Sequence, residues 1–142
     1  MVRINKKLEY ALILLGHWVR KPGLLSAKDA EQRFGLSFDV TSKVMQALAQ
    51  TGILKSVKGA RGGYLLEKDP ATVSMFDLHL ALVGPVSVAS CLQEDGICDL
   101  SEHCSILSPV LHLNERISQF YRGITVAELL RSAKAQAHAA QA

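Results

Sequence analysis

The segment Ile53-Leu-Lys-Ser-Val-Lys-Gly-Ala-Arg-Gly-Gly-Tyr-Leu-Leu-Glu67 decides the fold. Residues 53–58 alternate as in a β-strand, residues 59–63 form a glycine-rich turn, and residues 64–67 return as a second strand. The two segments before this hairpin carry helix signals. Ser26 opens a capping box, Gly35 ends that helix, and Ser37 can cap a second helix that runs through Gln50. Two short helices joined by a tight turn and followed at once by a hairpin predict a winged helix-turn-helix.

Further helices surround this unit. Apolar residues at helical spacing predict a helix over residues 5–20, with an inward stripe of Leu8, Leu12, Leu15 and Val19. A capping box at Ser74 opens another helix, which ends before Gly84. A long helix is predicted over residues 109–121, and Thr125 caps a final short one. The fold class is therefore mostly α with a small β-hairpin wing.

The 142-residue chain has the length of one domain, and no apolar run reaches the roughly 18 residues that a membrane span needs. Residues 1–62 hold eleven Lys/Arg against four Asp/Glu, whereas residues 63–142 hold five against nine. A basic first half is typical of a nucleic-acid partner, with a solvated basic face as the alternative. We expect a cytoplasmic protein without a structural disulfide set, because the cysteines are three, an odd number. No nucleophile–base pair or cofactor fingerprint indicates an enzyme.

The three cysteines lie together in Cys91-Leu-Gln-Glu-Asp-Gly-Ile-Cys98-Asp-Leu-Ser-Glu-His-Cys104. A polar loop of this kind can turn all three sulfur atoms toward one point. Three thiolates are a soft ligand set for an iron–sulfur cluster, zinc or copper(I). Zinc held by the cysteines and His103 is one alternative, and a thiol switch without metal is another.

Four local motifs and the overall layout resemble the Rrf-type winged-helix iron–sulfur transcription regulators. They are Glu9-Tyr10-Ala11, Gly35-Leu-Ser37, the wing from Gly52 to Tyr64, and the cysteine triplet followed by a long helix and Ile124-Thr-Val-Ala-Glu-Leu-Leu130. The resemblance covers residues 3–131. It implies a homodimeric DNA-binding regulator in which the long helix pairs with its mate across a two-fold axis.

The resemblance also implies a ligand set. Cys91, Cys98 and Cys104 match the three cysteine positions of the family, although the first spacing is one residue longer here. Clusters usually take four ligands. The histidine position of the cluster-assembly regulators is occupied by Leu107, whereas the carboxylate position of the nitric-oxide sensors is occupied by Glu9. Glu9 of the partner subunit is therefore the candidate fourth ligand, with His103 as the fallback.

The DNA-reading surface is expected on the second helix of the helix-turn-helix and on the wing. Residues near the start of that helix face bases, and wing cations reach phosphates or the minor groove. The candidates are Ser37, Phe38, Asp39, Thr41, Ser42 and Lys43 on the helix, and Lys58 and Arg61 on the wing. For Asp39 the alternative is a charge that favours the helix dipole.

Together these patterns predict a transcriptional regulator whose iron–sulfur cluster, 2Fe-2S or 4Fe-4S, senses redox state, nitric oxide or iron status and tunes operator binding. The alternative is a winged-helix regulator with a thiol switch or zinc site. The expected partners are a double-stranded DNA operator and a second copy of the chain. We expect a DNA-binding domain over residues 1–84 and a cysteine-rich cluster-binding loop over 85–107. A dimerisation helix and a short C-terminal helix follow over 108–131, with a flexible tail over 132–142.

Overall fold

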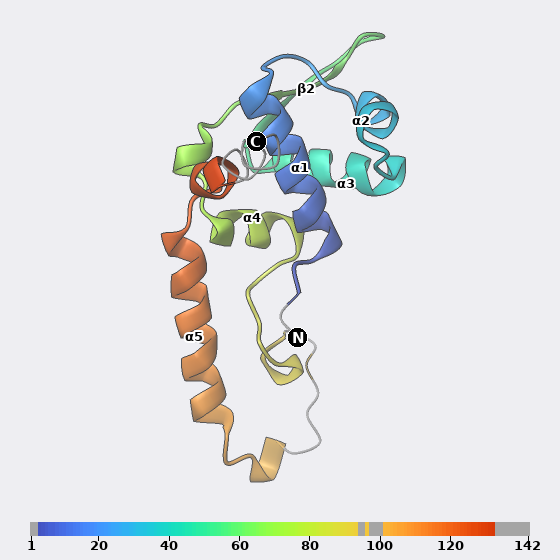
Figure 1. Ribbon diagram of the computed structural model, residues 1–142. Helices are drawn as coiled ribbons and strands as arrows, with labels where there is room; N and C mark the ends of the chain where they lie inside the picture. Colours follow the sequence, from blue (N-terminus) through green and yellow to red (C-terminus); the bar gives the residue numbers. More distant parts are fainter. Residues whose placement is uncertain (1–2, 94–95, 97–100, 133–142) are drawn as a thin grey trace.

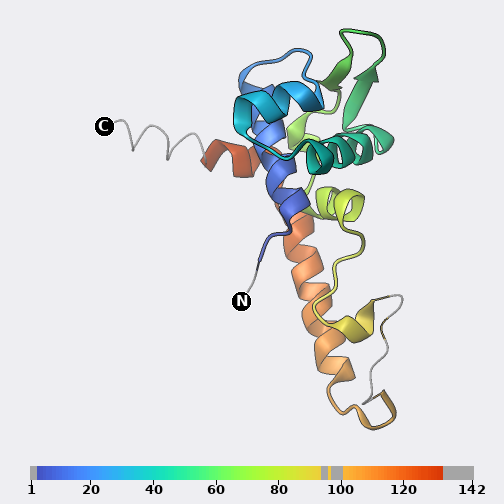
Figure 2. The ribbon, with the colours of Figure 1, turned by 90° about the vertical axis from the view of Figure 1, so that its right-hand side faces the viewer.

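The computed structural model describes residues 3–93, 96 and 101–132, so Cys98 and most of the expected C-terminal tail lie outside the described residues. Its helices are α1 (Lys6–Arg20), α2 (Ala27–Phe34), α3 (Phe38–Gln50), α4 (Met75–Leu82) and α5 (Leu107–Gly123). The strands are β1 (Leu54–Val57) and β2 (Gly63–Leu66), and short 3-10 turns span Pro70–Thr72, Ser90–Leu92 and Ser101–His103. Helices α1 to α4 and the hairpin form a body, from which α5 projects as a long arm (Figures 1 and 2).

Local capping signals placed the helix boundaries of the body. The Ser26 hydroxyl accepts from the Asp29 amide at 3.1 Å, and the Asp29 carboxylate accepts from the Ser26 amide at 3.1 Å. Gly35 ends α2 in the left-handed region at φ 67°, where a residue without Cβ is favoured. The second capping box, between Ser74 and Asp77, is also confirmed, with both hydrogen bonds at 3.0 Å.

The hairpin is an antiparallel pair in which Leu54 faces Leu66 and Val57 faces Gly63. It is tied to the body by a short bridge, because the Tyr64 amide donates to the Leu25 carbonyl at 2.8 Å and the Leu25 amide donates back at 3.0 Å. A Cβ on Gly63 would lie 2.8 Å from the Leu25 oxygen. Glycine at this position therefore permits the backbone approach that anchors the wing.

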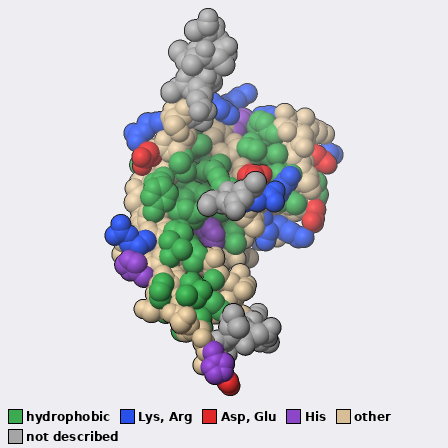
Figure 3. All heavy atoms as spheres, turned by 60° about the horizontal axis from the view of Figure 1, so that its bottom comes forward, with side chains coloured by type: hydrophobic (Ala, Val, Ile, Leu, Met, Phe, Trp, Pro, Cys, Tyr) green, Lys and Arg blue, Asp and Glu red, His purple; other side chains and the backbone are tan. Residues whose placement is uncertain are grey.

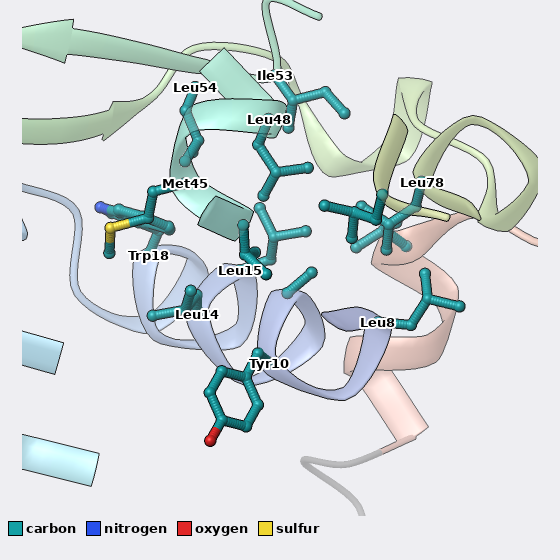
Figure 4. Close-up of a cluster of buried hydrophobic side chains, with 14 of the residues drawn as sticks. Leu8, Tyr10, Leu14, Leu15, Trp18, Met45, Leu48, Ile53, Leu54 and Leu78 are labelled. Carbon is teal, nitrogen blue, oxygen red and sulfur yellow. The ribbon is translucent and has the colours of Figure 1, made fainter. Parts of the chain in front are cut away.

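The core lies between α1, α3, α4 and β1 (Figure 4). Its fully buried side chains include Leu8, Leu14, Leu15, Trp18, Met45, Leu48, Leu54, Leu78 and Val126. The predicted inward stripe of α1 is only partly correct, because Val19 is exposed and Leu12 half-buried, whereas Leu14 and Trp18 are buried. The reason is that α1 contacts α3, α4 and β2, so its buried face is broader than one stripe.

The arm begins earlier than predicted, at Leu107 rather than at Pro109. Proline is tolerated in the first turn of a helix, where its missing N–H has no intrahelical acceptor. After Gly123 the chain returns to the body: the Val126 amide donates to the Val73 carbonyl at 2.9 Å, and residues 126–132 are helical. The Thr125 hydroxyl caps this last helix, as predicted, by accepting from the Glu128 amide at 3.1 Å. Among the described helices, none has the length and apolarity that crossing a membrane requires.

Candidate nucleic-acid interface and cysteine segment

The start of α3 is held by a residue of α1. The Tyr10 hydroxyl accepts a hydrogen bond from the Ser37 amide at 3.1 Å, and the Tyr10 side chain is 8% exposed. Ser37 occupies the N-cap position as predicted, but its own hydroxyl makes no capping hydrogen bond. The backbone at the N-cap of the recognition helix is thus held by a side chain 27 residues earlier, which no local pattern indicates.

The exposed side of α3 carries most of the predicted base-reading residues. Phe38 is 50% exposed, Ser42 is half-buried, and Ser37 is exposed. Asp39 and Lys43, both exposed, form an ion pair at 3.0 Å across one helical turn. An ion pair so open to solvent contributes little to stability, so it can open and leave both side chains free to bind another group.

Thr41 does not belong to this exposed side. Its side chain is fully buried, and its hydroxyl has no hydrogen-bond partner among the described residues. The prediction that Thr41 faces bases is wrong, because its helical position shares the inward face with Val44, Met45 and Leu48, all buried. Position near the helix start did not decide exposure; the helical period did.

A groove of about 460 Å³ runs between the first turns of α2 and α3 and the wing. Its lining residues are Ser26, Ala27, Lys28, Phe38, Ser56, Val57, Lys58, Gly59, Gly62, Gly63 and Tyr64. We call it the interface groove. Lys58 lies on its wall as the predicted wing cation, whereas Arg61 is exposed on the turn beyond it. No prediction from the sequence included Lys28, although its place inside the Ser26–Asp29 capping box, in the first turn of α2, could have indicated it.

A second cluster of cations lies where the ends of α1 and α2 meet. The half-buried His17 ring packs edge-on against Phe34, with ring centroids 5.2 Å apart. Burial lowers the pKa of His17 below its ordinary value of 6.5, and the neighbouring Arg33, Arg20 and Lys21 lower it further. His17 is therefore held towards its neutral form. At Asp29, the Ser26 amide and hydroxyl lower the pKa of the carboxyl, as expected for a capping box.

The described cysteines are unpaired thiols. Cys91 lies in the Ser90–Leu92 turn and Cys104 just after the Ser101–His103 turn, and both are half-buried. The Gly96 amide donates to the Gln93 carbonyl at 2.9 Å, and a Cβ on Gly96 would collide with the Ser90 carbonyl oxygen. The segment around Cys91 is therefore folded back tightly on itself.

The other predicted ligands, Glu9 and His103, join no candidate metal site among the described residues of one subunit. Glu9 is exposed on α1 between the buried Leu8 and Tyr10, and His103 is exposed beside Cys104. Over residues 3–93, 96 and 101–132, no three His, Cys, Asp or Glu side chains converge on a possible metal position. A complete ligand set would therefore need Cys98, which lies outside these ranges, and a further donor.

A cavity of about 400 Å³ separates α4 from the first turn of the cysteine segment, lined by His79, Val83, Pro85, Ser87, Leu92 and Gln93. The His79 Nδ1 atom lies 2.8 Å from the Gly84 carbonyl oxygen. Because a carbonyl oxygen only accepts, the Nδ1 atom donates this hydrogen bond. No motif in the sequence indicates a role for this histidine.

The arm exposes a large apolar surface. Leu107, Leu111, Leu113 and Phe120 are 46%, 49%, 52% and 63% exposed. Figure 3 shows hydrophobic side chains gathered along the arm and onto the adjoining part of the body. The root of the arm is fixed by Arg122, whose guanidinium lies 4.1 Å from the centroid of the Phe76 ring. Exposed apolar side chains in this number on one helix are typical of an interface with a partner.

Comparison with known proteins gives consistent matches. A family described as Rrf2, iron-dependent transcriptional regulator, matches residues 4–132. The HTH-type transcriptional regulator IscR of Yersinia enterocolitica is 31% identical over 110 residues, which cover 78% of this chain and 66% of that relative. The chain thus spans slightly less than two thirds of the length of this curated relative.

Solved structures share the fold. IscR of T. potens matches with a TM-score of 0.62 at 25% identity, over 93% of this chain and 88% of that one. CymR, the global cysteine regulator of B. subtilis, matches with a TM-score of 0.67 at 24% identity, over 93% of this chain and 98% of that one. These similarities confirm the winged-helix fold that the hairpin and its preceding helices predicted.

Proposed function

Because the chain belongs to the Rrf2 family of transcriptional regulators, we propose that it is a cytoplasmic homodimer that binds double-stranded operator DNA. A metal cluster controls this binding in our proposal. The observation that carries the DNA-binding part is the interface groove, where the starts of α2 and α3 meet the wing. Helix starts present unpaired N–H groups that suit phosphates. Lys28 and Lys58, both exposed, add cations at the same groove. The chain's relatives are regulators rather than enzymes.

Each contact class has a distinct role in this proposal. Lys58 and Arg61 neutralise phosphates or enter the minor groove, whereas Ser37, Asp39, Ser42 and Lys43 approach base edges from α3. Loss of one phosphate contact lowers the slope of log affinity against log salt by about one unit. A change at Ser42 instead alters the preferred sequence. Lys58→Ala and Ser42→Ala, compared by binding at several salt concentrations, separate the two roles.

The proposed dimer forms through the arm. Four leucine or phenylalanine side chains of α5 are 46–63% exposed. Pairing with a second copy of the chain would bury apolar surface of this kind away from water. The arms then hold two bodies at a fixed separation. Recognition helices of a dimer must match half-sites about one turn of DNA apart or a multiple of it.

The cysteine segment fits an iron–sulfur cluster. Cys91 and Cys104 are unpaired, half-buried thiols, and a Cβ on Gly96 would collide with the Ser90 carbonyl oxygen close to Cys91. Cys91, Cys98 and Cys104 would hold the cluster, with Glu9 of the partner subunit as fourth ligand and His103 as the fallback. When bound, such a cluster supplies a redox- and nitric-oxide-reactive centre. The exposure of Glu9 leaves its carboxylate accessible to a second subunit.

A thiol switch or zinc site without iron is the second candidate. The observation that supports a thiol switch is that Cys91 and Cys104 are both half-buried, unpaired thiols, which is the reduced state that such a switch requires. Anaerobic purification distinguishes the candidates. A cluster protein absorbs visible light and contains iron and acid-labile sulfide, whereas thiol-switch and zinc proteins are colourless.

Single variants then test the ligands. Replacing Cys91, Cys98 or Cys104 by alanine should abolish or destabilise the visible absorption, and Glu9→Ala should shift it while the apo fold is kept. Full iron and sulfide content in all three cysteine variants would refute the cluster site. Equal operator affinity of holo and apo protein at one salt concentration would refute cluster control but not DNA binding.

A further inference from the structure

The recognition helix begins with an aromatic residue that the body does not cover. Phe38 is the first residue of α3, and half of its surface remains exposed to solvent. Its neighbours in sequence, Ser37 and Asp39, are exposed polar residues. A phenylalanine in this setting contributes little to the core, so its apolar surface is available for contact with a partner.

Phe38 lines the interface groove together with groups of two different kinds. Lys28 and Lys58 bring positive charge from α2 and the wing, whereas Val57, 36% exposed, brings a second apolar surface. The groove therefore combines cations with apolar contact area. The major groove of duplex DNA offers a partner for each kind of group. Its phosphates are negatively charged and would pair with the lysines, and the thymine methyl groups are apolar and would contact the apolar side chains.

We propose that Phe38 reads the 5-methyl group of a thymine in each operator half-site, an inference that rests on the proposed DNA-binding function. The first residues of a recognition helix are those that contact base edges. Phe38 has no donor or acceptor, so it cannot read the hydrogen-bonding pattern of a base. Thymine alone presents a methyl group in the major groove, and this group is where an apolar side chain gains contact. Phe38 thus makes one position of the half-site specific for thymine.

The test uses the full chain and separates this inference from the proposed function. A random DNA library is first selected for binding, and each thymine of the enriched half-site is then replaced singly by uracil, which removes only the methyl group. For the wild-type chain, one such replacement should weaken binding about fourfold, from the transfer free energy of one methyl group. Phe38→Ala should bind the thymine operator more weakly and lose the uracil effect, whereas Phe38→Leu should keep it.

Leu80 provides a matched control. It is 49% exposed, close to the 50% of Phe38, and lies on α4 outside the interface groove. Leu80→Ala should therefore show the wild-type uracil effect. An enriched operator that is bound without any uracil effect, or an effect that persists in Phe38→Ala, would overturn the inference alone. Failure to enrich any sequence would overturn the proposed function, and this inference with it.

Discussion

Replacing Tyr10 by phenylalanine tests whether the link between α1 and α3 holds the recognition helix in place. The change keeps the buried ring but removes the oxygen that accepts from the Ser37 amide at 3.1 Å. A hydrogen bond of this kind contributes about 1 kcal/mol net. The Ser37 amide can reach water when its acceptor is lost, since Ser37 is exposed, so we expect no larger penalty. The free energy of unfolding should fall by about 1 kcal/mol, and the melting temperature by about 3 °C.

Urea unfolding and operator binding measure the two consequences of Tyr10→Phe. If α3 must be ordered at its start to bind, up to the same free energy is lost from binding, or about fivefold in affinity. Tyr121→Phe is the matched control, because the Tyr121 ring packs near His79 at 5.8 Å while its hydroxyl makes no hydrogen bond within the described ranges. Equal unfolding midpoints and equal operator affinities for Tyr10→Phe, Tyr121→Phe and wild type would refute the reasoning.

Three further predictions concern the wing, the cation cluster and the arm. Gly63→Ala should lower the free energy of unfolding by about 1–3 kcal/mol, because the added Cβ would lie 2.8 Å from a carbonyl oxygen. Gly123→Ala is the control and should not lower it, because nothing lies within 4 Å of a Cβ there. Urea unfolding of both variants measures the difference. His17 has a folded-state pKa below its ordinary value of 6.5, so the stability that it contributes is complete above pH 6.5 and is lost as the pH falls through the folded-state pKa. His17→Gln should therefore weaken the dependence of the free energy of unfolding on pH below pH 6.5, and an unchanged dependence would contradict this. Leu113→Glu should shift the chain from dimer to monomer in sedimentation velocity, since the side chain is 52% exposed on α5; a dimer of unchanged affinity would exclude this face as the interface.

Local signals predicted the body well because the responsible contacts lie close in sequence. The capping boxes at Ser26 and Ser74 each join residues three apart, and both formed as predicted. The glycines of the wing likewise mark a turn whose partners are near neighbours. These features can be recognised from one sequence because their energetics depend on a few adjacent residues.

The features that were missed depend on packing between distant segments. The hydrogen bond between Tyr10 and Ser37 spans 27 residues, and the burial of Thr41 depends on how α3 lies against the core. Lys28 joins the interface groove only because the wing folds back over the start of α2. The cysteine ligands remain a prediction, because one subunit does not supply a complete set among its described residues.

The core has a consequence for how this chain tolerates change. Among the described residues, every buried core side chain comes from residues 8–82 or from Val126. The described residues between Leu82 and Val126, which include Cys91, Cys104 and α5, contribute none of them. Changes in this stretch therefore remove none of the buried apolar side chains that hold the body together. Natural variation and protein engineering can therefore change this stretch while the winged-helix body keeps its core.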